Sequence, residues 1–325
     1  MTTQRDTFIG HLFEYAKNDK DIYLVTVDQG APTLDRWRKE LPNQFLSCGI
    51  SEQHAINFAA GMAAGGKKVY VYFMAAWVAR CFEQIRYSCA MAENPITILG
   101  NGVGLGYAPA GPAHEPNEDI AYMRSLVGIE IITPCNNRVT EDLIRLTIEE
   151  PKLRYIRLER KYATELDNVY STPGVPCLSN NFLNKGVAIM KPGLSENPLR
   201  TKSKIGIISC GYMLGRSAKV MKKLLTEGHD CSVIDIWRIK PIIHNNLLEC
   251  ISKYDVIVTI EEQTLSGGLG SAVCEVLMDN RIKKNILRIG LPERYIFENG
   301  GRDYHLDNNG LSVDSIANKI LNFVK

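Results

Sequence analysis

One carboxylate, Glu52, stands at the start of a long apolar segment. It lies within Gly49-Ile50-Ser51-Glu52-Gln53-His54-Ala55, and residues 56–65 are almost all apolar or small. A helix that is apolar almost all round is expected to be buried. Because a carboxylate is costly to take out of water, Glu52 should have either a partner or a chemical role. The simpler alternative is an acid that the helix macrodipole stabilises.

Other side chains with useful chemistry also follow predicted strands. Trp77 and Arg80 follow one strand, and His114 lies in a Gly-Pro loop after another. Arg157 and Arg160 lie at the end of a third strand. Because ligands bind at the carboxyl ends of the strands in an open parallel sheet, these residues are candidates for one site. The structural alternatives are a core tryptophan, a surface histidine and solvated charges.

The elements that must position these residues alternate between β-rich runs and helical patterns. In the first half of the chain the predicted strands are 22–27, 69–73, 96–99, 129–132 and 154–158, with a short run at 45–48. The predicted helices are the one that begins at Glu52, 76–91, 118–126 and 139–149. This alternation predicts an α/β fold with a mostly parallel, doubly wound sheet and right-handed crossovers.

The composition changes between about 163 and 203, where Pro, Gly, Ser and Asn are frequent. This composition is typical of a linker, and one short strand is predicted in it near 186–189. Alternation then resumes, with strands at 205–209, 231–236, 256–260 and 286–290 and helices at 214–227, 268–278 and 313–324. We therefore predict two doubly wound domains, 1–165 and 204–325, joined by a linker at 166–203.

The bulk composition is that of an ordinary globular protein. The 325 residues carry a formal net charge of +2, which indicates neither nucleic-acid binding nor attachment to an anionic membrane. The chain has no run of about 18 apolar residues, and its start has no secretory pattern. Nine scattered cysteines without a Cys-x-x-Cys pair favour buried thiols in a reducing cytoplasm.

Several segments, in order along the whole chain, resemble the transketolase family. The segment 49–55 resembles the signature of the pyrimidine-binding domain of thiamine-diphosphate enzymes, and 73–84 resembles the block that follows it. Gly111-Pro112-Ala113-His114-Glu115-Pro116 is similar to the Gly-Pro-Thr-His-Gln-Pro block of transketolases. In the second domain the matching segments are 261–263, 267–270 and, similar to deoxyxylulose-phosphate synthases, 292–300.

The resemblance implies that thiamine diphosphate is the cofactor. The reactive carbon of this cofactor loses its proton to the cofactor's own imino group, which needs a proton on N1′ of the aminopyrimidine. The resemblance assigns the carboxylate beside N1′ to Glu52 and the stacking ring to Trp77. Arg80, Phe73 and Met74 are expected to line the same pocket, although core packing is the alternative for the last two.

The resemblance also implies substrate-binding residues. His114 is expected to face the reacting end of the substrate and to move protons, for which its pKa range is suited. Arg160 matches the arginine that binds the substrate phosphate, and a guanidinium suits bidentate phosphate binding. Asp28 matches an early acid of the family that lies near the subunit interface.

Two departures from the family pattern bear on function. Transketolases that recognise a particular sugar hydroxyl have Asp four residues before the histidine, where this chain has Ala110. The chain also has no Gly-Asp-Gly motif, which holds Mg²⁺ and the cofactor diphosphate in these enzymes. The glycine-rich run 102–106 has no acid for Mg²⁺, and we interpret it as a flexible loop facing the site. A partner subunit with Gly-Asp-Gly is therefore expected to bind the diphosphate and Mg²⁺ in an α2β2 assembly.

The function that these features predict is transfer of a two-carbon ketol unit from a ketose to an aldehyde, with a sugar or sugar phosphate as substrate. The active site would be shared with the partner subunit. Three alternatives remain at this point. They are the beta subunit of a 2-oxo-acid dehydrogenase, a condensing enzyme like deoxyxylulose-phosphate synthase, and a non-catalytic scaffold subunit, which would need neither Glu52 nor His114.

Overall fold

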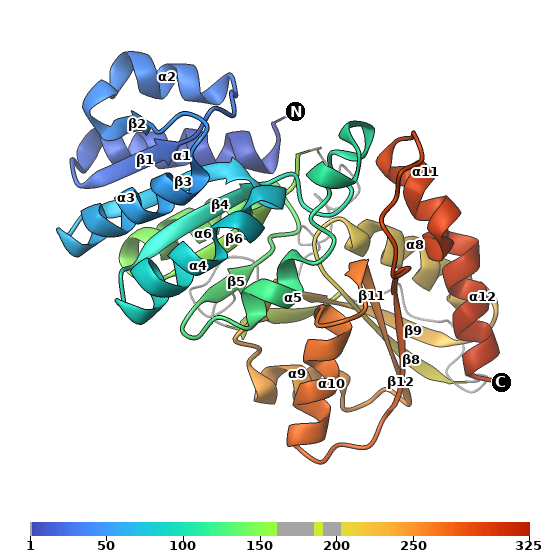
Figure 1. Ribbon diagram of the computed structural model, residues 1–325. Coiled ribbons are helices and arrows are strands. Elements are labelled where there is room, and N and C mark those ends of the chain that lie inside the picture. Colours follow the sequence, from blue (N-terminus) through green and yellow to red (C-terminus); the bar gives the residue numbers. More distant parts are fainter. Residues whose placement is uncertain (1, 161–184, 191–202) are drawn as a thin grey trace. The chain divides into compact units, whose positions relative to one another are not determined.

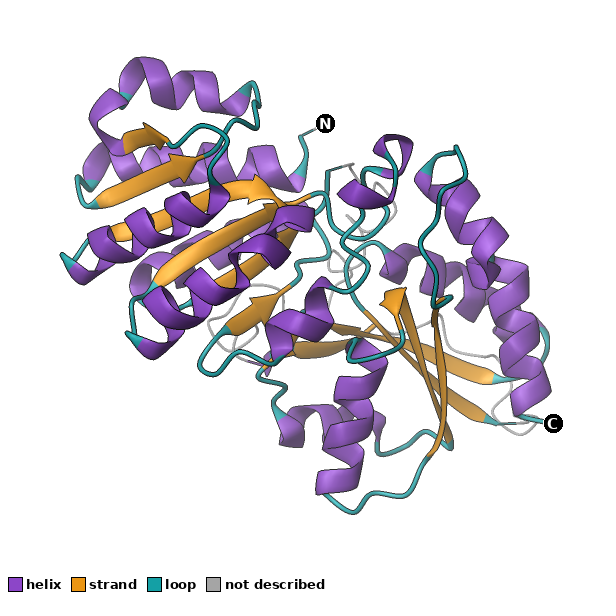
Figure 2. Cartoon of the chain, viewed as in Figure 1, coloured by secondary structure: helices purple, strands orange, loops and turns teal. Residues whose placement is uncertain are grey.

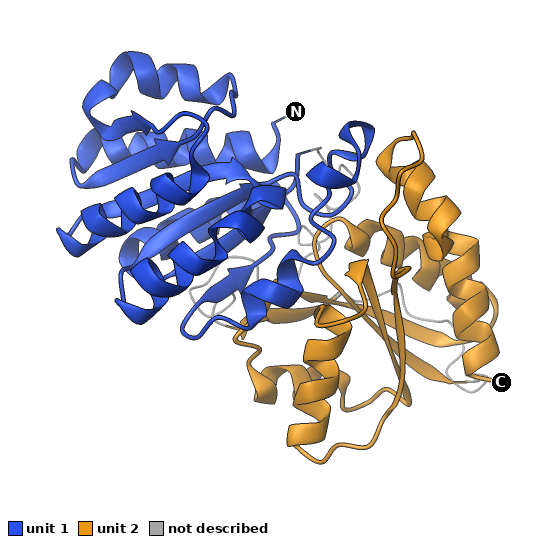
Figure 3. Cartoon of the chain, viewed as in Figure 1, with its two compact units in different colours: residues 1–162 blue, residues 163–325 orange. Residues whose placement is uncertain are grey.

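The chain forms two compact units, Met1–Tyr162 and Ala163–Lys325 (Figure 3). The structure is a computed structural model that describes residues 2–160, 185–190 and 203–325. Most of the predicted linker, 166–203, lies outside the described residues. Each unit has a mainly parallel sheet with helices against it (Figure 2), so the predicted α/β fold class is confirmed.

The first unit is built on a parallel sheet with the strand order β5-β6-β4-β3-β1-β2 (Figure 1). Its strands are β1 (Ile22–Thr26), β2 (Phe45–Ser47), β3 (Lys68–Met74), β4 (Ile96–Asn101), β5 (Glu130–Ile132) and β6 (Arg154–Leu158). Every described pairing between these strands is parallel. The carboxyl ends of β1, β3, β4 and β6 therefore lie next to one another along one edge of the sheet.

The helices of the first unit connect these strands. They are α1 (Gln4–Asn18), α2 (Thr33–Glu40), η1 (Pro42–Gln44), α3 (Glu52–Ala64), α5 (Asp119–Arg124) and α6 (Asn137–Glu149). The side chain of Asn136 caps α6 by accepting a hydrogen bond from the backbone N–H of Val139. The sequence reasoning omitted α1 and α2, although buried residues of α1 recur at 8, 9, 12, 13 and 16 with helical spacing.

Residues 76–91, predicted as one helix, form three different helical pieces. They are the 3₁₀-helix η2 (Ala75–Cys81), the short α4 (Phe82–Gln84) and the π-helical η3 (Ile85–Met91). In a 3₁₀-helix, side chains three residues apart lie on the same side. Trp77 and Arg80 have this spacing, and the Arg80 guanidinium carbon lies 5.8 Å from the centre of the Trp77 ring system. The irregular helix therefore brings two candidate residues together.

The prediction that α3 is buried all round is wrong for this chain by itself. One face is buried, and it consists of Glu52, Ala55, Ile56, Ala59, Ala60 and Ala63. The opposite face is exposed and includes Gln53, His54, Asn57, Phe58 and Gly61. Only one side of the helix packs onto its own unit, so its remaining apolar surface is left uncovered by the described residues.

The second unit has a sheet with the strand order β12-β11-β8-β9-β7. The strands of this sheet are β7 (Val187–Met190), β8 (Lys204–Ser209), β9 (Asp230–Ile236), β11 (Val256–Thr264) and β12 (Asn285–Leu291), and the short β10 (Arg238–Lys240) is not one of them. β7 pairs antiparallel with β9, and the other described pairings in this sheet are parallel. The helical segments are α8 (Met213–Thr226), α9 (His244–Ile251), α10 (Leu269–Asp279), α11 (Arg302–Leu306), η8 (Asp307–Leu311) and α12 (Val313–Phe323).

The glycine-rich turn before α10 is occupied by a carboxylate of the same unit. Glu261 accepts hydrogen bonds from the backbone N–H groups of Leu269 at 2.6 Å and Gly270 at 2.9 Å. These are the N–H groups that an anion would need at a helix N-terminus. A Cβ at Gly268 would lie 2.1 Å from a Glu261 carboxylate oxygen. The glycines of 267–270 therefore accommodate Glu261 rather than a phosphate.

The described cysteines are all free thiols, and Cys177 lies outside the described residues. Burial raises the pKa of the Cys81 and Cys89 thiols to about 12, so both remain protonated near neutral pH. Of the helices that the structure describes, none is long and apolar enough to cross a membrane.

Candidate active site

Glu52 lies at the first position of α3, after the turn that leaves β2. Gly49 has φ +65° in this turn, a left-handed conformation that favours glycine. The Glu52 side chain is 4% exposed, and Arg80 Nη1 donates a hydrogen bond to its Oε2 over 3.2 Å. The Arg80 side chain is 52% exposed. A buried carboxylate is thus paired with one half-exposed cation from η2.

Trp77 lies beside Arg80 of this ion pair, and His114 lies beside Trp77. The His114 ring centre is 6.4 Å from that of Trp77, and the guanidinium of Arg80, in the same helix η2 as Trp77, lies 5.8 Å from the Trp77 ring. His114 ends the 3₁₀-helix η5 (Pro112–His114), which begins after Gly111 at φ +82°. Its Nδ1 is buried, and no hydrogen-bond partner for it occurs in the described part of the chain. The arrangement joins a carboxylate, two rings and an unsatisfied imidazole nitrogen.

Phe73 and Met74 are the last residues of β3, in the middle of the sheet. Their neighbours across the sheet are Gly100 and Asn101 of β4. Both side chains are buried. They form part of the core at the carboxyl edge of the sheet, where the strand leads directly into η2.

Arg160 follows β6 at the same edge of the sheet, and Asp28 follows β1. The guanidinium carbon of Arg160 lies 4.2 Å from the centre of the Tyr107 ring. The Tyr107 hydroxyl in turn accepts hydrogen bonds from the side chains of Gln29 and Asn101. The residues Tyr107, Gln29 and Asn101 were not among the predicted site residues. Gln29 and Asn101 lie two residues after the predicted strands 22–27 and 96–99, and Tyr107 follows the glycine-rich run 102–106. Asp28 is exposed, and no ion pair for it occurs among the described residues.

Arg157, grouped with Arg160 in the sequence, has a structural role instead. Its Nε and Nη2 donate to the two carboxylate oxygens of Asp119 over 2.7 and 3.0 Å. The Tyr155 hydroxyl donates to the same carboxylate over 2.8 Å. All three side chains are buried. Because its donors are taken by Asp119 in a bidentate pair, Arg157 is poorly placed to bind a substrate.

The glycine-rich segment 102–106 is a packed turn and not the expected flexible loop. Its residues are buried, and the backbone N–H of Gly102 donates to the carbonyl of Leu158 over 2.9 Å. Gly106 closes a tight turn by donating to the carbonyl of Val103. The segment therefore fixes the position of Tyr107 at its end.

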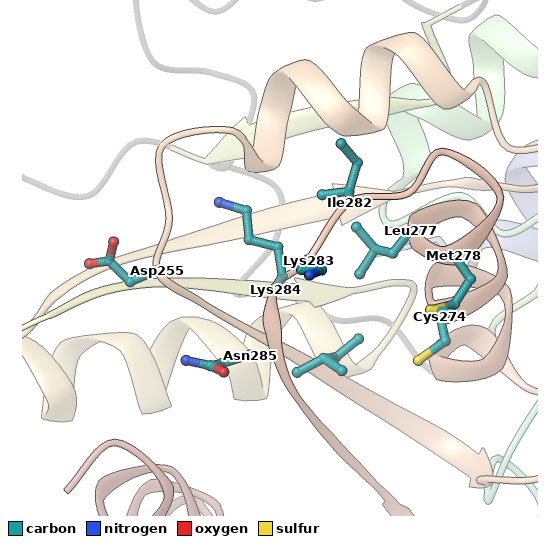
Figure 4. Close-up of a pocket in the computed structure, with 9 residues that line it drawn as sticks. Asp255, Cys274, Leu277, Met278, Ile282, Lys283, Lys284 and Asn285 are labelled. Carbon is teal, nitrogen blue, oxygen red and sulfur yellow. The ribbon is translucent and has the colours of Figure 1, made fainter.

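A separate cavity of about 610 Å³ lies in the second unit (Figure 4). It is lined by Asp255 and Asn285 at the amino ends of β11 and β12 and by residues at the end of α10. Ligands of open parallel sheets bind at the opposite, carboxyl ends. Lys284 also already donates to the carbonyls of Ser252 and Tyr254. The cavity therefore does not resemble a catalytic site.

Comparison with known proteins identifies the family. The pyrimidine-binding domain of transketolase matches residues 3–164, and the transketolase C-terminal domain matches residues 196–316. A subunit of the apulose-4-phosphate transketolase of Phocaeicola vulgatus is 32% identical over the whole chain, which covers 98% of that protein. The chain belongs to the transketolase family.

The chain covers different shares of the length of its other relatives. It is 28% identical to the 1-deoxy-D-xylulose-5-phosphate synthase of Caldanaerobacter subterraneus but spans only 48% of that enzyme. A Pichia stipitis transketolase structure shares the fold, with a TM-score of 0.78 over 46% of its length. By contrast, a split-gene transketolase, solved as an inactive β4 tetramer, matches over 99% of its chain with a TM-score of 0.81 and 25% identity.

This transketolase-family chain therefore matches a subunit and a split-gene relative over nearly their whole length, and the longer relatives over about half of theirs. It contains the pyrimidine-binding and C-terminal domains. Family membership implies dependence on thiamine diphosphate and a transferase activity, as the sequence motifs predict.

Proposed function

We propose that Glu52, Trp77, Arg80 and His114 form the pyrimidine-side half of a thiamine-diphosphate site that transfers a two-carbon ketol unit between sugars. The observation that carries the proposal is the buried carboxylate of Glu52, whose partner Arg80 lies near the Trp77 ring, with the His114 ring 6.4 Å from that of Trp77. A scaffold subunit would need neither a desolvated carboxylate nor an unsatisfied imidazole nitrogen.

The residues present suit the aminopyrimidine end of the cofactor. Glu52 offers a carboxylate oxygen at a helix start, where a pyrimidine nitrogen can hydrogen-bond to it in surroundings of low polarity. Trp77 offers a flat apolar surface, worth about 0.5–1.5 kcal/mol beyond its buried area for an aromatic pair. Phe73 and Met74 are buried at the end of the strand that leads into η2; as successive strand residues they point to opposite faces of the sheet, so at most one of them lines this space.

Each residue of the site has a separate role in the proposed reaction. When bound, thiamine diphosphate supplies the carbon nucleophile that carries the two-carbon unit. Glu52 holds a proton at the pyrimidine nitrogen N1′. His114 donates or accepts a proton at an oxygen of the substrate, and its buried, unpartnered Nδ1 is the atom available for this. Arg80 keeps Glu52 in place through the 3.2 Å ion pair.

The diphosphate end requires a second chain. No group of three or more His, Cys, Asp or Glu side chains able to hold a metal occurs among the described residues. The whole sequence also has no Gly-Asp-Gly. A diphosphate carries charge that needs a metal and hydrogen-bond donors. We therefore assign Mg²⁺ and the diphosphate to a partner subunit with Gly-Asp-Gly in an α2β2 enzyme.

The exposed face of α3 is the surface that we assign to this partner. Phe58 is 39% exposed on that face, and Ile50, just before the helix, is 81% exposed. The same face also carries the polar side chains of Gln53, His54 and Asn57, and a partner would bury the two apolar ones. The partner would complete this burial and at the same time close the site that begins at Glu52.

The substrate that we propose is a phosphorylated sugar. The relative from Phocaeicola vulgatus is named for apulose 4-phosphate, a sugar phosphate. Arg160, at the edge of the sheet, offers an exposed guanidinium for the phosphate. Ala110 in place of the family's Asp removes one hydrogen-bonding group, so the preferred sugar configuration should differ from that of ordinary transketolases.

A second candidate activity is a condensation of the 1-deoxy-D-xylulose-5-phosphate synthase type. The observation that favours it is 28% identity to such an enzyme over 97% of this chain. The same residues around Glu52 would serve both reactions.

The free thiols of the described cysteines suit the cytoplasm as the compartment of either activity.

Ketol transfer by the isolated chain and by the assembled enzyme tests this function. With thiamine diphosphate, Mg²⁺ and a panel of ketose phosphates and aldehydes, we expect no turnover by the chain alone. Addition of a subunit that carries Gly-Asp-Gly should produce turnover. The split-gene relative solved as a β4 tetramer is described as inactive. Turnover by the isolated chain would refute the two-chain proposal, and turnover only with pyruvate as donor would favour the condensation.

A further inference from the structure

A polar cluster surrounds Tyr107 at the carboxyl edge of the first sheet. Gln29 Nε2 and Asn101 Nδ2 donate hydrogen bonds to the Tyr107 hydroxyl over 2.9 and 2.8 Å. Gln29 follows β1 and Asn101 is the last residue of β4, so the two amides come from different strands. Two donors on one hydroxyl oxygen fix the position of the phenol ring at this edge.

The glycine-rich turn is shaped around the Tyr107 ring. Gly102 has φ +77°, and a Cβ at this position would lie 1.9 Å from the ring atom Cε2 of Tyr107. No side chain fits in that space. Burial raises the pKa of the Tyr107 hydroxyl, so the ring stays neutral under ordinary conditions. The cluster thus holds a neutral aromatic ring in one place and orientation.

Arg160 lies against this fixed ring. Its guanidinium carbon is 4.2 Å from the ring centre, within the range of a cation–π contact. Among the described residues, no carboxylate lies within ion-pair distance of Arg160. Arg157, three residues earlier, is by contrast fully engaged by Asp119. The guanidinium of Arg160 is therefore oriented by an aromatic ring that leaves its N–H donors free for an anion.

We propose that Tyr107, anchored by Gln29 and Asn101, is a positioning residue that holds Arg160 ready for the phosphate of the substrate. The inference rests on the proposed role of Arg160. A long arginine side chain loses conformational entropy when it binds a ligand. Tyr107 reduces that loss because it already restricts the Arg160 guanidinium in the unbound enzyme. The guanidinium contacts the face of an aromatic ring, and a ring face, unlike a carboxylate, does not compete with phosphate for the N–H donors. Tyr107 thereby favours phosphorylated over unphosphorylated sugars.

The test uses the assembled enzyme with a ketose phosphate, the same ketose without phosphate, and inorganic phosphate as a competitive inhibitor. Tyr107→Leu removes the ring, so KM for the phosphorylated substrate and the inhibition constant of inorganic phosphate should rise about two- to fivefold. The change should appear in KM rather than kcat, and KM for the unphosphorylated ketose should stay the same. Tyr107→Phe keeps the ring and should restore most of the phosphate affinity.

A double variant separates positioning from a general loss of structure. Because Tyr107 acts through Arg160, Tyr107→Leu should add nothing to the effect of Arg160→Ala on phosphate affinity. Tyr23→Leu is the matched control, since Tyr23 is a tyrosine near a cation, Lys67, at the opposite end of β1. If Tyr107→Leu does not fold, Gln29→Ala should show the same KM selectivity to a smaller degree.

Two results would overturn the inference in different ways. Equal KM changes for the phosphorylated and unphosphorylated ketose, or an additive double variant, would show that Tyr107 does not act through Arg160. An Arg160→Ala variant with unchanged phosphate inhibition would instead refute the phosphate-binding role of Arg160 on which the inference depends.

Discussion

Two buried carboxylates at the starts of helices have different partners and therefore different roles. Asp119 accepts hydrogen bonds from Nε and Nη2 of Arg157 and from the Tyr155 hydroxyl, so both of its carboxylate oxygens are engaged inside the unit. Among the described residues, Glu52 has one ion-pair partner, Arg80, whose side chain is half exposed. A carboxylate with remaining capacity is available to a ligand, whereas one in a complete network stabilises the fold.

Glu52→Gln in the assembled enzyme should reduce turnover by about 10²- to 10⁴-fold, because an amide cannot hold the proton that the pyrimidine nitrogen needs. The fold should persist, since glutamine keeps the shape of the side chain. Steady-state kinetics and circular dichroism measure the two effects. Glu83→Gln, an exposed glutamate of α4, is the control and should leave turnover unchanged. Near-normal turnover of Glu52→Gln would remove Glu52 from its assigned role.

At the scale of elements, the site depends on short irregular segments rather than on long helices. The 3₁₀ geometry of η2 aligns Trp77 with Arg80, and η5 carries His114 after a glycine with positive φ. Hydrophobic periodicity predicts a single helix over 76–91 because it records which residues are apolar but not how tightly the backbone is wound. The strands, by contrast, were predicted within a few residues except for the short β10, since continuous apolar runs are typical of parallel strands.

The turn at Gly102 gives a stability prediction. Gly102→Ala would place a Cβ 1.9 Å from the Tyr107 ring in a left-handed backbone conformation. We expect a loss of unfolding free energy of at least about 1–3 kcal/mol. Gly10→Ala in α1 meets no atom within 4 Å and should instead stabilise the chain by about 0.5–1 kcal/mol. Urea denaturation of both variants measures the difference, and equal stabilities would contradict the packing described for Tyr107.

At the scale of the whole molecule, two features of the described residues are consistent with a partner subunit. The outer face of α3 leaves Phe58 exposed, and no group of three or more His, Cys, Asp or Glu side chains able to hold a metal occurs among the described residues. A partner subunit that covers α3 would account for both. The homologous β4 tetramer shows that a split relative of this chain can associate with itself.

Phe58→Glu should weaken assembly with the partner subunit by at least about tenfold, because an unpaired carboxylate would be buried at the interface. Tyr15→Glu is the matched control, since Tyr15 is 41% exposed on α1 and Phe58 is 39% exposed on α3. Analytical ultracentrifugation of the mixed subunits measures the dissociation constant. Equal weakening by both substitutions, or by neither, would show that the exposed face of α3 does not meet the partner.

The sequence by itself determined the family and the α/β class, and it made Glu52, Trp77 and His114 candidates, because motif order and hydrophobic alternation are local properties of the chain. It also determined that the diphosphate motif is absent. Arg157 and Arg160 look alike in the sequence. Only the tertiary structure showed that Arg157 is paired with Asp119, whereas Arg160 lies against the Tyr107 ring. The cluster of Gln29, Asn101 and Tyr107 required the parallel sheet, which brings the ends of β1 and β4 to one edge although about 70 residues separate them.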